Sequence, residues 1–497
     1  MAIRAAVLAL ALTAALLTAA CTPDAEFRGV WVHAFAPGAK TPAEIDQLIE
    51  RVLAANANAV IVQVGRRGDA YYHRGLQPRT EDPAVPPDFD ALQYLIERAH
   101  AAPQRIEVHA WLTTLAAWNV RLGAAPASPD HVFNRHGPSQ AGPDDWFSRR
   151  YDGARTAADD YYLDPGHPDA VDYVAALYAM LARNYEVDGI HLDRVRYPEV
   201  AAAPGVRAEW GYNPVAVARF QAATGRTDVP PPDDAAWSDW RRRQVTGLVR
   251  KIYLHAVAAR PRVKVSAATI PWGPGPASLE QYARTETYRR VLQDPIGWLR
   301  EGILDIDIPM NYDREHNATE RAWFRQWVEF EKDHQYGRHV VIGPGWYLNT
   351  IGGSLAQVRA ARAPSRAGQR ARGVCGYSYQ GTNSEGRPFS EMARALTQPS
   401  EYDPENTPVF ARKVPMPVLP WKTRPARGHL MGTVRADGPP ADGLEVSLSG
   451  PEPRTAVTDG RGWFGAVDLL PGTYRVSAGG ASVTVEVRAG EVAEVSL

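Results

Sequence analysis

Residues 26–398 repeat one pattern, in which a short apolar run is followed by a segment whose apolar positions have helical spacing. Short apolar runs bounded by turn residues are typical of buried strands. The runs predict strands at residues 27–35, 59–64, 106–112, 187–193, 263–268, 303–312, 340–347 and 373–377. The second run is almost purely apolar, as expected for a parallel strand that is buried on both faces.

The segments between these runs predict helices. At residues 41–53, Thr41 is suited to cap a helix and Pro42 to its first position, while Ile45, Leu48 and Val52 share one face. Further helices are expected near residues 89–102, 168–185, 240–259 and 319–333. Strands that alternate with helices predict an α/β fold, a (β/α)8 TIM barrel over residues 26–398. An open doubly wound sheet is the alternative, but no glycine-rich phosphate loop follows any strand.

The pattern changes after residue 398. Residues 399–427 are rich in proline and read as a linker, and residues 428–497 alternate polar and apolar positions in short runs. Strands are expected at residues 430–434, 444–448, 455–458, 474–477, 482–487 and 492–497, which together predict a small all-β sandwich. Residues 432–434, 458–464 and 470–474 resemble the carboxypeptidase regulatory-like domain. That resemblance implies a spacer or a binding module.

The N-terminus has the pattern of a secretory signal. Residues 1–20 carry one positive charge, at Arg4, followed by an alanine- and leucine-rich run that ends in Ala19-Ala20-Cys21. Small residues before a cysteine resemble a bacterial lipoprotein signal, in which Cys21 is lipidated and becomes the new N-terminus. Ordinary secretion with cleavage near Ala20 is the alternative. We therefore expect an exported protein anchored to a membrane through Cys21, and Thr22 after the cysteine indicates the outer membrane of a Gram-negative cell.

Composition narrows the function only a little. Apolar residues make up 45% of the chain and charged residues 22%, which is typical of a globular protein. The formal net charge of −1 gives no electrostatic case for nucleic acid as a partner. The 14 Trp and 21 Tyr can stack against sugar rings, but they can also fill a large core. The sequence does not determine the oligomeric state.

Two aspartates are the candidate catalytic groups, because a barrel places its chemistry at the carboxyl ends of its strands. Asp193 ends the fourth predicted strand and Asp313 follows the sixth. Two carboxylates facing one cleft are the minimal equipment of a glycosidase. Asp193, with arginines nearby, suits the nucleophile or base, and Asp313 the acid. Glu315 could take the acid role instead, or Asp313 could be a loop residue paired with Arg314.

Other side chains near the strand ends are candidates for substrate binding. They are His33, Gln63, His109, Trp111, His191, Arg194, Arg196, Tyr312, Trp346 and Tyr379. Each of the three histidines could instead be hydrogen-bonded in place in the barrel. If they converged with Asp193, they would favour a metal-dependent hydrolase of the amidohydrolase type. No metal or cofactor is predicted, because neither a His-x-x-x-His motif nor a cysteine pair with ligand spacing occurs.

Four motifs in order resemble one known family. Residues 27–32, 161–168, 188–198 and 308–312 are similar to the glycosyl hydrolase-like 10 family of bacterial lipoproteins. The resemblance implies a barrel that hydrolyses glycans, and divisome-associated members are similar to enzymes that cleave peptidoglycan strands stripped of their stem peptides. Many members carry two successive acids where this chain has Asp193-Arg194, so the resemblance carries over only Asp193.

The sequence does not decide which polymer is the substrate. Aspartates after the fourth and sixth strands also resemble the arrangement in retaining α-glycosidase barrels, so an α-glucan is a second candidate substrate. The competing class is a non-catalytic envelope lipoprotein whose barrel mouth binds a glycan without cutting it.

Overall fold

The computed structural model describes residues 25–199, 208–435 and 441–497. The predicted signal at residues 1–20 and the lipidation site Cys21 lie outside the described residues. Eight parallel strands form one sheet, in the order β10-β1-β2-β3-β6-β7-β8-β9. They are β1 (Phe27–Val32), β2 (Ala59–Gly65), β3 (Glu107–Thr113), β6 (Gly189–Asp193), β7 (Lys264–Thr269), β8 (Ile306–Pro309), β9 (His339–Val340) and β10 (Gly373–Tyr377).

The sheet curls into a barrel, as predicted. Isolated parallel bridges join Ile342 to Val374 and Gly345 to Tyr377, so the two edge strands meet beyond the end of β9. The sixth and seventh strands are shorter than the pattern predicts. The apolar run at residues 340–347 is regular only in β9 and then forms a turn of 3-10 helix, η3 (Trp346–Leu348). Pro344 interrupts the ladder because proline has no N–H to donate to it.

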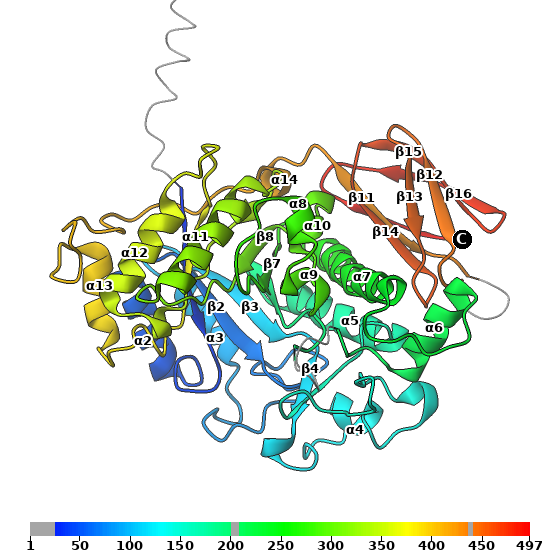
Figure 1. The fold of residues 1–497 in the computed structure, drawn as a ribbon, viewed down its shortest axis with the longest axis horizontal. Helices are drawn as coiled ribbons and strands as arrows, with labels where there is room; N and C mark the ends of the chain where they lie inside the picture. The colour runs from blue at the N-terminus through cyan, green and yellow to red at the C-terminus, as the bar shows by residue number, and fades with distance from the viewer. Residues whose placement is uncertain (1–24, 200–207, 436–440) are drawn as a thin grey trace, which may run out of the picture.

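Helices cover the outside of the barrel (Figure 1). The main ones are α2 (Pro42–Ala54), α3 (Ala91–His100), α5 (Pro168–Asn184), α7 (Ala235–Ala259), α10 (Pro295–Glu301), α11 (Ala318–Asp333), α12 (Ile351–Arg362) and α13 (Phe389–Thr397). Helix α2 begins as predicted, since the Thr41 hydroxyl accepts a hydrogen bond from the Glu44 N–H at 3.3 Å. Its predicted apolar face, including Ile45, Leu48 and Val52, is fully buried.

Long excursions interrupt the alternation on both sides of β6. Between β3 and α5 the chain forms an antiparallel pair, β4 (Ala116–Asn119) and β5 (Asp160–Tyr162), at the ends of the barrel strands. The shorter elements are η1 (Val120–Leu122), α4 (Val132–His136), η2 (Gly142–Asp144), α6 (Pro214–Thr224), α8 (Leu279–Tyr282) and α9 (Glu286–Arg289). The segment between β3 and α5 therefore has secondary structure of its own.

A carboxyl group buried in β8 makes stability depend on pH. Asp307 is 2% exposed and accepts a hydrogen bond from the Thr269 hydroxyl at 2.6 Å. Burial raises its pKa to about 7. Between pH 4 and 7 the folded protein holds a proton here that the unfolded chain releases, so the free energy of unfolding falls as the pH rises through this range.

Replacing Asp307 by asparagine removes the ionisable group and keeps an acceptor for Thr269. We expect Asp307→Asn to raise the free energy of unfolding at pH 8 by about 1–4 kcal/mol and to change it little at pH 4. Urea unfolding at both pH values measures this difference, with Asp130→Asn, on the exposed loop before α4, as the control. An Asp307→Asn protein no more stable than wild type at pH 8 contradicts the prediction.

The linker packs across the end of the barrel where the strands begin. It contains α14 (Pro420–Thr423), where the Trp421 Nε1–H donates to Asp305 Oδ1 at 2.6 Å. Lys422 Nζ lies 3.2 Å from Asp305 Oδ2. Asp305 directly precedes β8, so the linker is held to the barrel by a buried charged cluster rather than extending freely.

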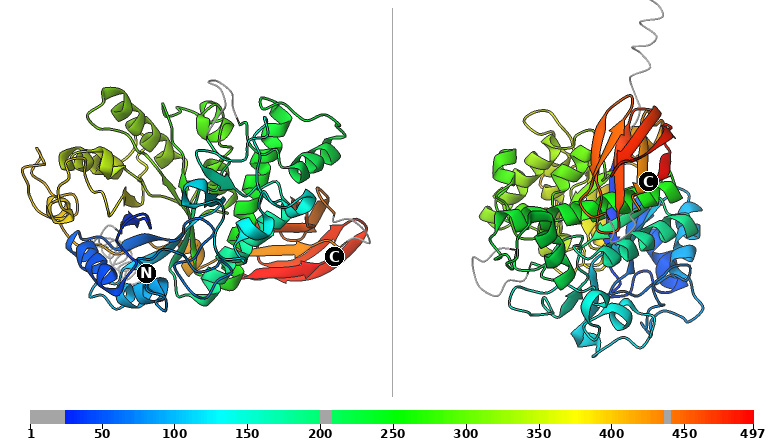
Figure 2. Two further views of the ribbon diagram at one scale, coloured as in Figure 1. Left: turned by 90° about the horizontal axis from the view of Figure 1, so that it is seen from below. Right: turned by 90° about the vertical axis from the view of Figure 1, so that its right-hand side faces the viewer.

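The C-terminal region is all β, in a three-stranded and a four-stranded sheet. Its strands are β11 (Gly428–Thr433), β12 (Glu445–Ser449), β13 (Arg454–Val457), β14 (Trp463–Leu469), β15 (Gly472–Ala478), β16 (Ala481–Val487) and β17 (Val492–Ser496). Figures 1 and 2 show them, in orange to red, against one side of the barrel beside α7. Strand β14 was not among the predicted strands. Trp463 and Val467 pack into the barrel core, while Phe464 and Leu469 pack into the sandwich, so both of its faces are buried and its sequence does not alternate.

Within the described residues, no helix has both the length and the apolar character needed to cross a membrane.

Candidate active site

A cavity of about 240 Å³ opens where the barrel strands end. Of the predicted site residues, six line it: Gln63, Trp111, Asp193, Arg194, Arg196 and Tyr312. They come from β2, β3, β6 and the segments after β6 and β8, so the barrel brings together residues far apart in the sequence. This is the end of a barrel where catalytic groups are expected.

Asp193 is the last residue of β6 and reaches the floor of this cavity. It pairs in register with Thr113 of β3, and its Oδ2 accepts a hydrogen bond from the Trp111 indole N–H at 3.2 Å. Among the described residues, no arginine, lysine or histidine forms an ion pair with Asp193. Its carboxylate is therefore held in place by a neutral donor and remains available to a substrate.

Small residues let the strand lie close to its neighbours below this point. A Cβ atom on Gly189 would lie 2.2 Å from Nδ1 of His109, so no larger residue fits at the start of β6 without displacing that ring. The packing that fixes β6, and with it Asp193, depends on this close approach.

The chain turns sharply after Asp193. Arg194 has φ +52°, in the left-handed region that a non-glycine residue adopts only at a cost. The turn ends the strand and lets the guanidinium reach Asp160 Oδ2 at 3.2 Å and the hydroxyl of Tyr162. The same conformation places Arg194 in the cavity wall instead of continuing the ladder.

Asp160 is a second carboxylate in the cavity wall, and the sequence reasoning did not single it out. It is buried and forms ion pairs with Arg67 and Arg194, each at 3.2 Å. The Asn119 amide also donates to it at 2.7 Å. Two arginines and an amide occupy its two oxygens, so Asp160 is suited to positioning the arginines.

Removing this anion tests its positioning role. We expect Asp160→Asn to lower kcat/KM by about tenfold or more, because Arg67 and Arg194 lose their shared partner and repel each other. The matched control is Asp152→Asn, whose ion pair with Arg150 is exposed on the same excursion. Steady-state kinetics on both variants decide the point, and equal activity in the two would contradict the role.

Aromatic rings form much of the remaining wall. Tyr312 lies 5.2 Å from Tyr377 and 6.0 Å from Tyr347, measured between ring centroids. Phe35 and Tyr347 are 55% and 42% exposed, so their rings stand at the rim and are open to a ligand. Burial raises the pKa of Tyr377 to about 12, which keeps its phenol neutral and able to donate a hydrogen bond. Rings and neutral hydroxyls of this kind suit a sugar.

Asp313 does not line the cavity, although it directly follows Tyr312, which does. Burial raises its pKa to about 7, with a smaller contribution from the negative charge of Glu320 on α11. The charge of Asp313 in turn helps to raise the pKa of Glu331, a buried residue of α11. The pKa of Asp313 is that of a general acid, but the carboxyl is not part of the cavity lining.

The structure also bears on the two alternatives to Asp313 as the acid, which are an Asp313–Arg314 ion pair and Glu315 as the acid. Arg314 pairs with Glu320 at 3.1 Å, so the predicted Asp313–Arg314 pair is not found among the described residues. Glu315 pairs with Arg325 of α11 at 2.7 Å and lies outside the cavity lining. An ion-paired glutamate is a weaker candidate for the acid than Asp313.

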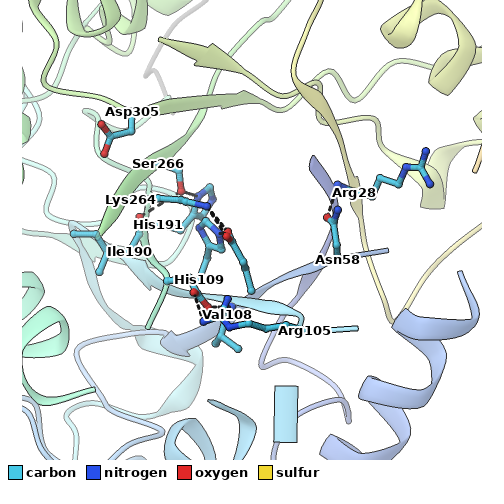
Figure 3. A network of polar contacts seen from close by, with 12 residues as sticks. Arg28, Asn58, Arg105, Val108, His109, Ile190, His191, Lys264, Ser266 and Asp305 are labelled. Carbon is cyan, nitrogen blue, oxygen red and sulfur yellow. Dashed lines mark hydrogen bonds and ion pairs between the residues drawn. The ribbon is translucent and has the colours of Figure 1, made fainter. Parts of the chain in front are cut away.

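His109 and His191 lie inside the barrel and not at its mouth (Figure 3). Both are fully buried. His191 lies 2.9 Å from the Ser266 hydroxyl and accepts from the Trp31 indole N–H at 3.1 Å, while His109 lies 3.3 Å from Glu107. The expectation that they contact a sugar is therefore corrected: the alternation that puts them on the face of Asp193 also puts them in deeper layers.

The other three predicted binding residues lie around the cavity without lining it. His33 is half-buried, with its ring 6.0 Å from that of Tyr377 and 5.7 Å from that of Phe35, so it supports the rim. Trp346 is buried over Gly376. Tyr379 is buried on the α2 side, where its hydroxyl lies 3.0 Å from Arg51. The chain's turn after β10 takes Tyr379 away from the mouth.

The described residues hold no group of three histidine, cysteine, aspartate or glutamate side chains placed to bind a metal ion. The convergence of His33, His109 and His191 on Asp193, which the amidohydrolase alternative needs, is not found, since two of these histidines are bonded inside the barrel.

Arg66 and Arg67 are cavity residues that the sequence reasoning missed. The sequence did contain a signal for both arginines, because they directly follow β2, at the strand end where barrel sites lie. Asp160 had a weaker signal, because it belongs to an excursion whose course over the barrel only the fold reveals.

The chain belongs to a known family. A family model described as glycosyl hydrolase-like 10 matches residues 26–354. Glycosyl hydrolase YngK of Bacillus subtilis is 25% identical over 309 residues, covering 58% of this chain and 54% of that protein. Glycosyl hydrolase DigH of Escherichia coli K12 is 25% identical over 338 residues, covering 62% of this chain and 69% of that protein. The match thus spans about half the length of YngK.

The fold also resembles a solved structure. The catalytic domain of β-amylase from Paenibacillus polymyxa is 14% identical and superposes with a TM-score of 0.50, covering 72% of this chain and 93% of that one. At this identity the likeness concerns the barrel fold alone.

Proposed function

Because the chain belongs to the glycosyl hydrolase-like 10 family, we propose that it is a glycoside hydrolase that cleaves a cell-envelope glycan at the mouth of its barrel. The observation that carries the proposal is the position of Asp193, a carboxylate without an ion partner among the described residues, on the floor of a cavity walled by aromatic rings. A carboxylate of this kind can attack an anomeric carbon or activate water.

In the proposed reaction, Asp193 acts as nucleophile or base. The Trp111 N–H orients its carboxylate through the hydrogen bond at 3.2 Å. Cleavage also requires protonation of the departing oxygen. Asp313 is the predicted acid because its pKa of about 7 leaves it protonated near neutrality. Because Asp313 does not line the cavity, this role requires its carboxyl to move toward Asp193 when a glycan binds.

The proposed substrate is peptidoglycan whose stem peptides have been removed. The support is the family membership together with the export signal predicted at residues 1–20, which would place the enzyme in the envelope through a lipid on Cys21. The resemblance to retaining α-glycosidase barrels makes an α-glucan the second polymer to test.

A second function, binding a glycan without cleaving it, is favoured by one observation. Within the described residues, the cavity lining holds no carboxylate besides Asp193 and the ion-paired Asp160. A binding protein needs no second acid, so the assay must measure cleavage and binding separately.

The test is to incubate the purified protein with denuded glycan strands, with peptidoglycan that retains its peptides, and with soluble α-glucan. New reducing ends and the masses of the products report cleavage, and co-sedimentation reports binding. We expect products from denuded strands in preference to the other two. Binding without any new reducing ends would replace the hydrolase with the glycan-binding protein.

A further inference from the structure

The cavity around Asp193 carries more positive than negative charge. Four arginines line it, against two aspartates: Arg66, Arg67, Arg194 and Arg196 against Asp160 and Asp193. Resting on the proposed function of this cavity as a glycan site, we propose that it selects a sugar that bears a carboxylate, and that Arg66 and Arg196 bind this group.

The four arginines are not equivalent. Arg67 and Arg194 share Asp160, each at 3.2 Å, so their charge is balanced inside the protein. Asp160 cannot serve the other two in the same way, because its two oxygens and the Asn119 amide already form a closed set of contacts. The N–H groups left for a ligand are therefore on Arg66, which has no ion pair among the described residues, and on Arg196, whose ion pair with Glu199 involves only Nη2.

Of the two arginines, Arg196 provides the stronger evidence for an anion site. It is 5% exposed and lines the cavity, yet its Nε and Nη1 have no hydrogen-bond partner in the part of the chain that the structure describes. Its nearest carboxylate, Glu199, lies 3.5 Å from Nη2 and leaves the other two nitrogens free. Unpaired N–H groups on a buried cation are costly, and an anionic ligand would satisfy them.

Arg66 lies after β2, which β3 separates from β6 in the sheet. Its Nη1 donates to the Ala34 carbonyl at 3.3 Å, and its guanidinium lies 5.3 Å from the centre of the Phe35 ring. Its Nε is buried without a hydrogen-bond partner, and no carboxylate among the described residues forms an ion pair with it. The Phe35 ring is exposed at the rim, so a sugar stacked there would bring its substituents close to Arg66.

The geometry of a guanidinium favours a carboxylate. Two parallel N–H donors match its two oxygens, and such charge-assisted bonds are shorter and stronger than bonds to hydroxyls. A neutral glycan would leave Arg196 unsatisfied. In denuded peptidoglycan every muramic acid has a free lactyl carboxylate, and in peptide-bearing strands the same group is an uncharged amide. A carboxylate site would thus distinguish the two forms of one polymer.

Binding measured by titration calorimetry on the Asp193→Asn protein separates recognition from cleavage. The ligands are three tetrasaccharides with the same backbone linkage: a denuded muramic acid tetrasaccharide, its lactyl carboxamide, and chitotetraose, with a tetragalacturonate added to ask whether any carboxylated sugar suffices. We expect the denuded ligand to bind at least about tenfold more tightly than its carboxamide and than chitotetraose, and the preference to shrink as salt increases.

Arg66→Gln and Arg196→Gln should each weaken binding of the denuded ligand about tenfold or more and leave chitotetraose binding within about threefold. Arg321→Gln, an exposed arginine on α11, is the control and should change neither. If Arg196→Gln lowers the unfolding midpoint sharply, Arg66→Gln alone carries the test, since Arg66 is half-buried and outside the core. Tight tetragalacturonate binding would support carboxylate recognition without lactyl specificity.

Equal affinity for the carboxylate and carboxamide ligands would overturn the inference, even if the wild type cleaves glycans. Selective binding of the acidic ligand without cleavage by the wild type would support the inference and refute the proposed hydrolase. The two failures are therefore distinguishable.

Discussion

Replacing Asp193 by asparagine is expected to abolish glycan cleavage, lowering kcat by about 10³-fold or more, while leaving binding within about threefold. Asparagine has the same shape, and its side-chain oxygen can still accept the Trp111 N–H bond, so the cavity should keep its form. What is lost is the negative charge that attacks the anomeric carbon or takes a proton from water. Reducing-end release under saturating substrate measures kcat.

The control for this experiment is Asp130→Asn, which makes the same chemical change on an exposed loop of the excursion. Thermal unfolding of both variants shows whether the fold is intact. If Asp193→Asn cleaves denuded strands at a rate within tenfold of wild type, Asp193 is not the catalytic carboxylate, and the proposed site is wrong whatever the protein binds.

Replacing Asp313 by asparagine is expected to lower kcat by about 10²- to 10⁴-fold, the usual contribution of a general acid. The Asp313 carboxyl has a pKa of about 7, raised by burial and by the nearby Glu320, so it is protonated below pH 7 and ionised above it. Because an acid must carry its proton, wild-type kcat should fall as the pH rises through about 7. The variant should lose this descending limb along with its activity.

A pH–rate profile of wild type and Asp313→Asn between pH 4.5 and 9, at about half-unit steps, measures both effects. The structure makes this a demanding test, since Met310 and Tyr312 of this segment line the cavity and Asp313 does not. Activity within tenfold of wild type, with the descending limb still present, would show that the proton comes from another group. Glu315→Gln is then the next variant, although its ion pair with Arg325 must first break.

The C-terminal sandwich bears on how such experiments are designed. Trp463 and Val467 of β14 belong to the barrel's own core, and Lys251 of α7 pairs with Asp459 at 2.8 Å. Removing residues 428–497 would therefore expose apolar surface on the barrel. The full chain is the appropriate protein for each assay.

The eight-stranded barrel could be predicted from the sequence because the signals for its strands and helices lie within short segments of the chain. Runs such as residues 59–64 are apolar enough to form a strand buried on both faces, and the helix at residues 41–53 carries its own cap in Thr41. The position of Asp193 followed from the same pattern, since a charged residue that ends a buried parallel strand lies at the mouth of a barrel. Strand β14 was not predicted because the barrel buries one of its faces and the sandwich buries the other. Its sequence therefore lacks the alternation of polar and apolar residues that marks a strand.

Which residues form the site, by contrast, depends on which segments of the chain meet in space. Asp160 is 93 residues from Arg67 and 34 from Arg194, and only the fold of the excursion brings the three into contact. Periodicity correctly put His191 on the face of Asp193 but could not say how deep in the barrel that face lies. The sequence by itself determined the eight barrel strands, the main helices between them and the catalytic candidate at the end of β6. Tertiary structure alone decided the partners of that carboxylate, because ion pairing and burial depend on distances between segments that no local pattern encodes.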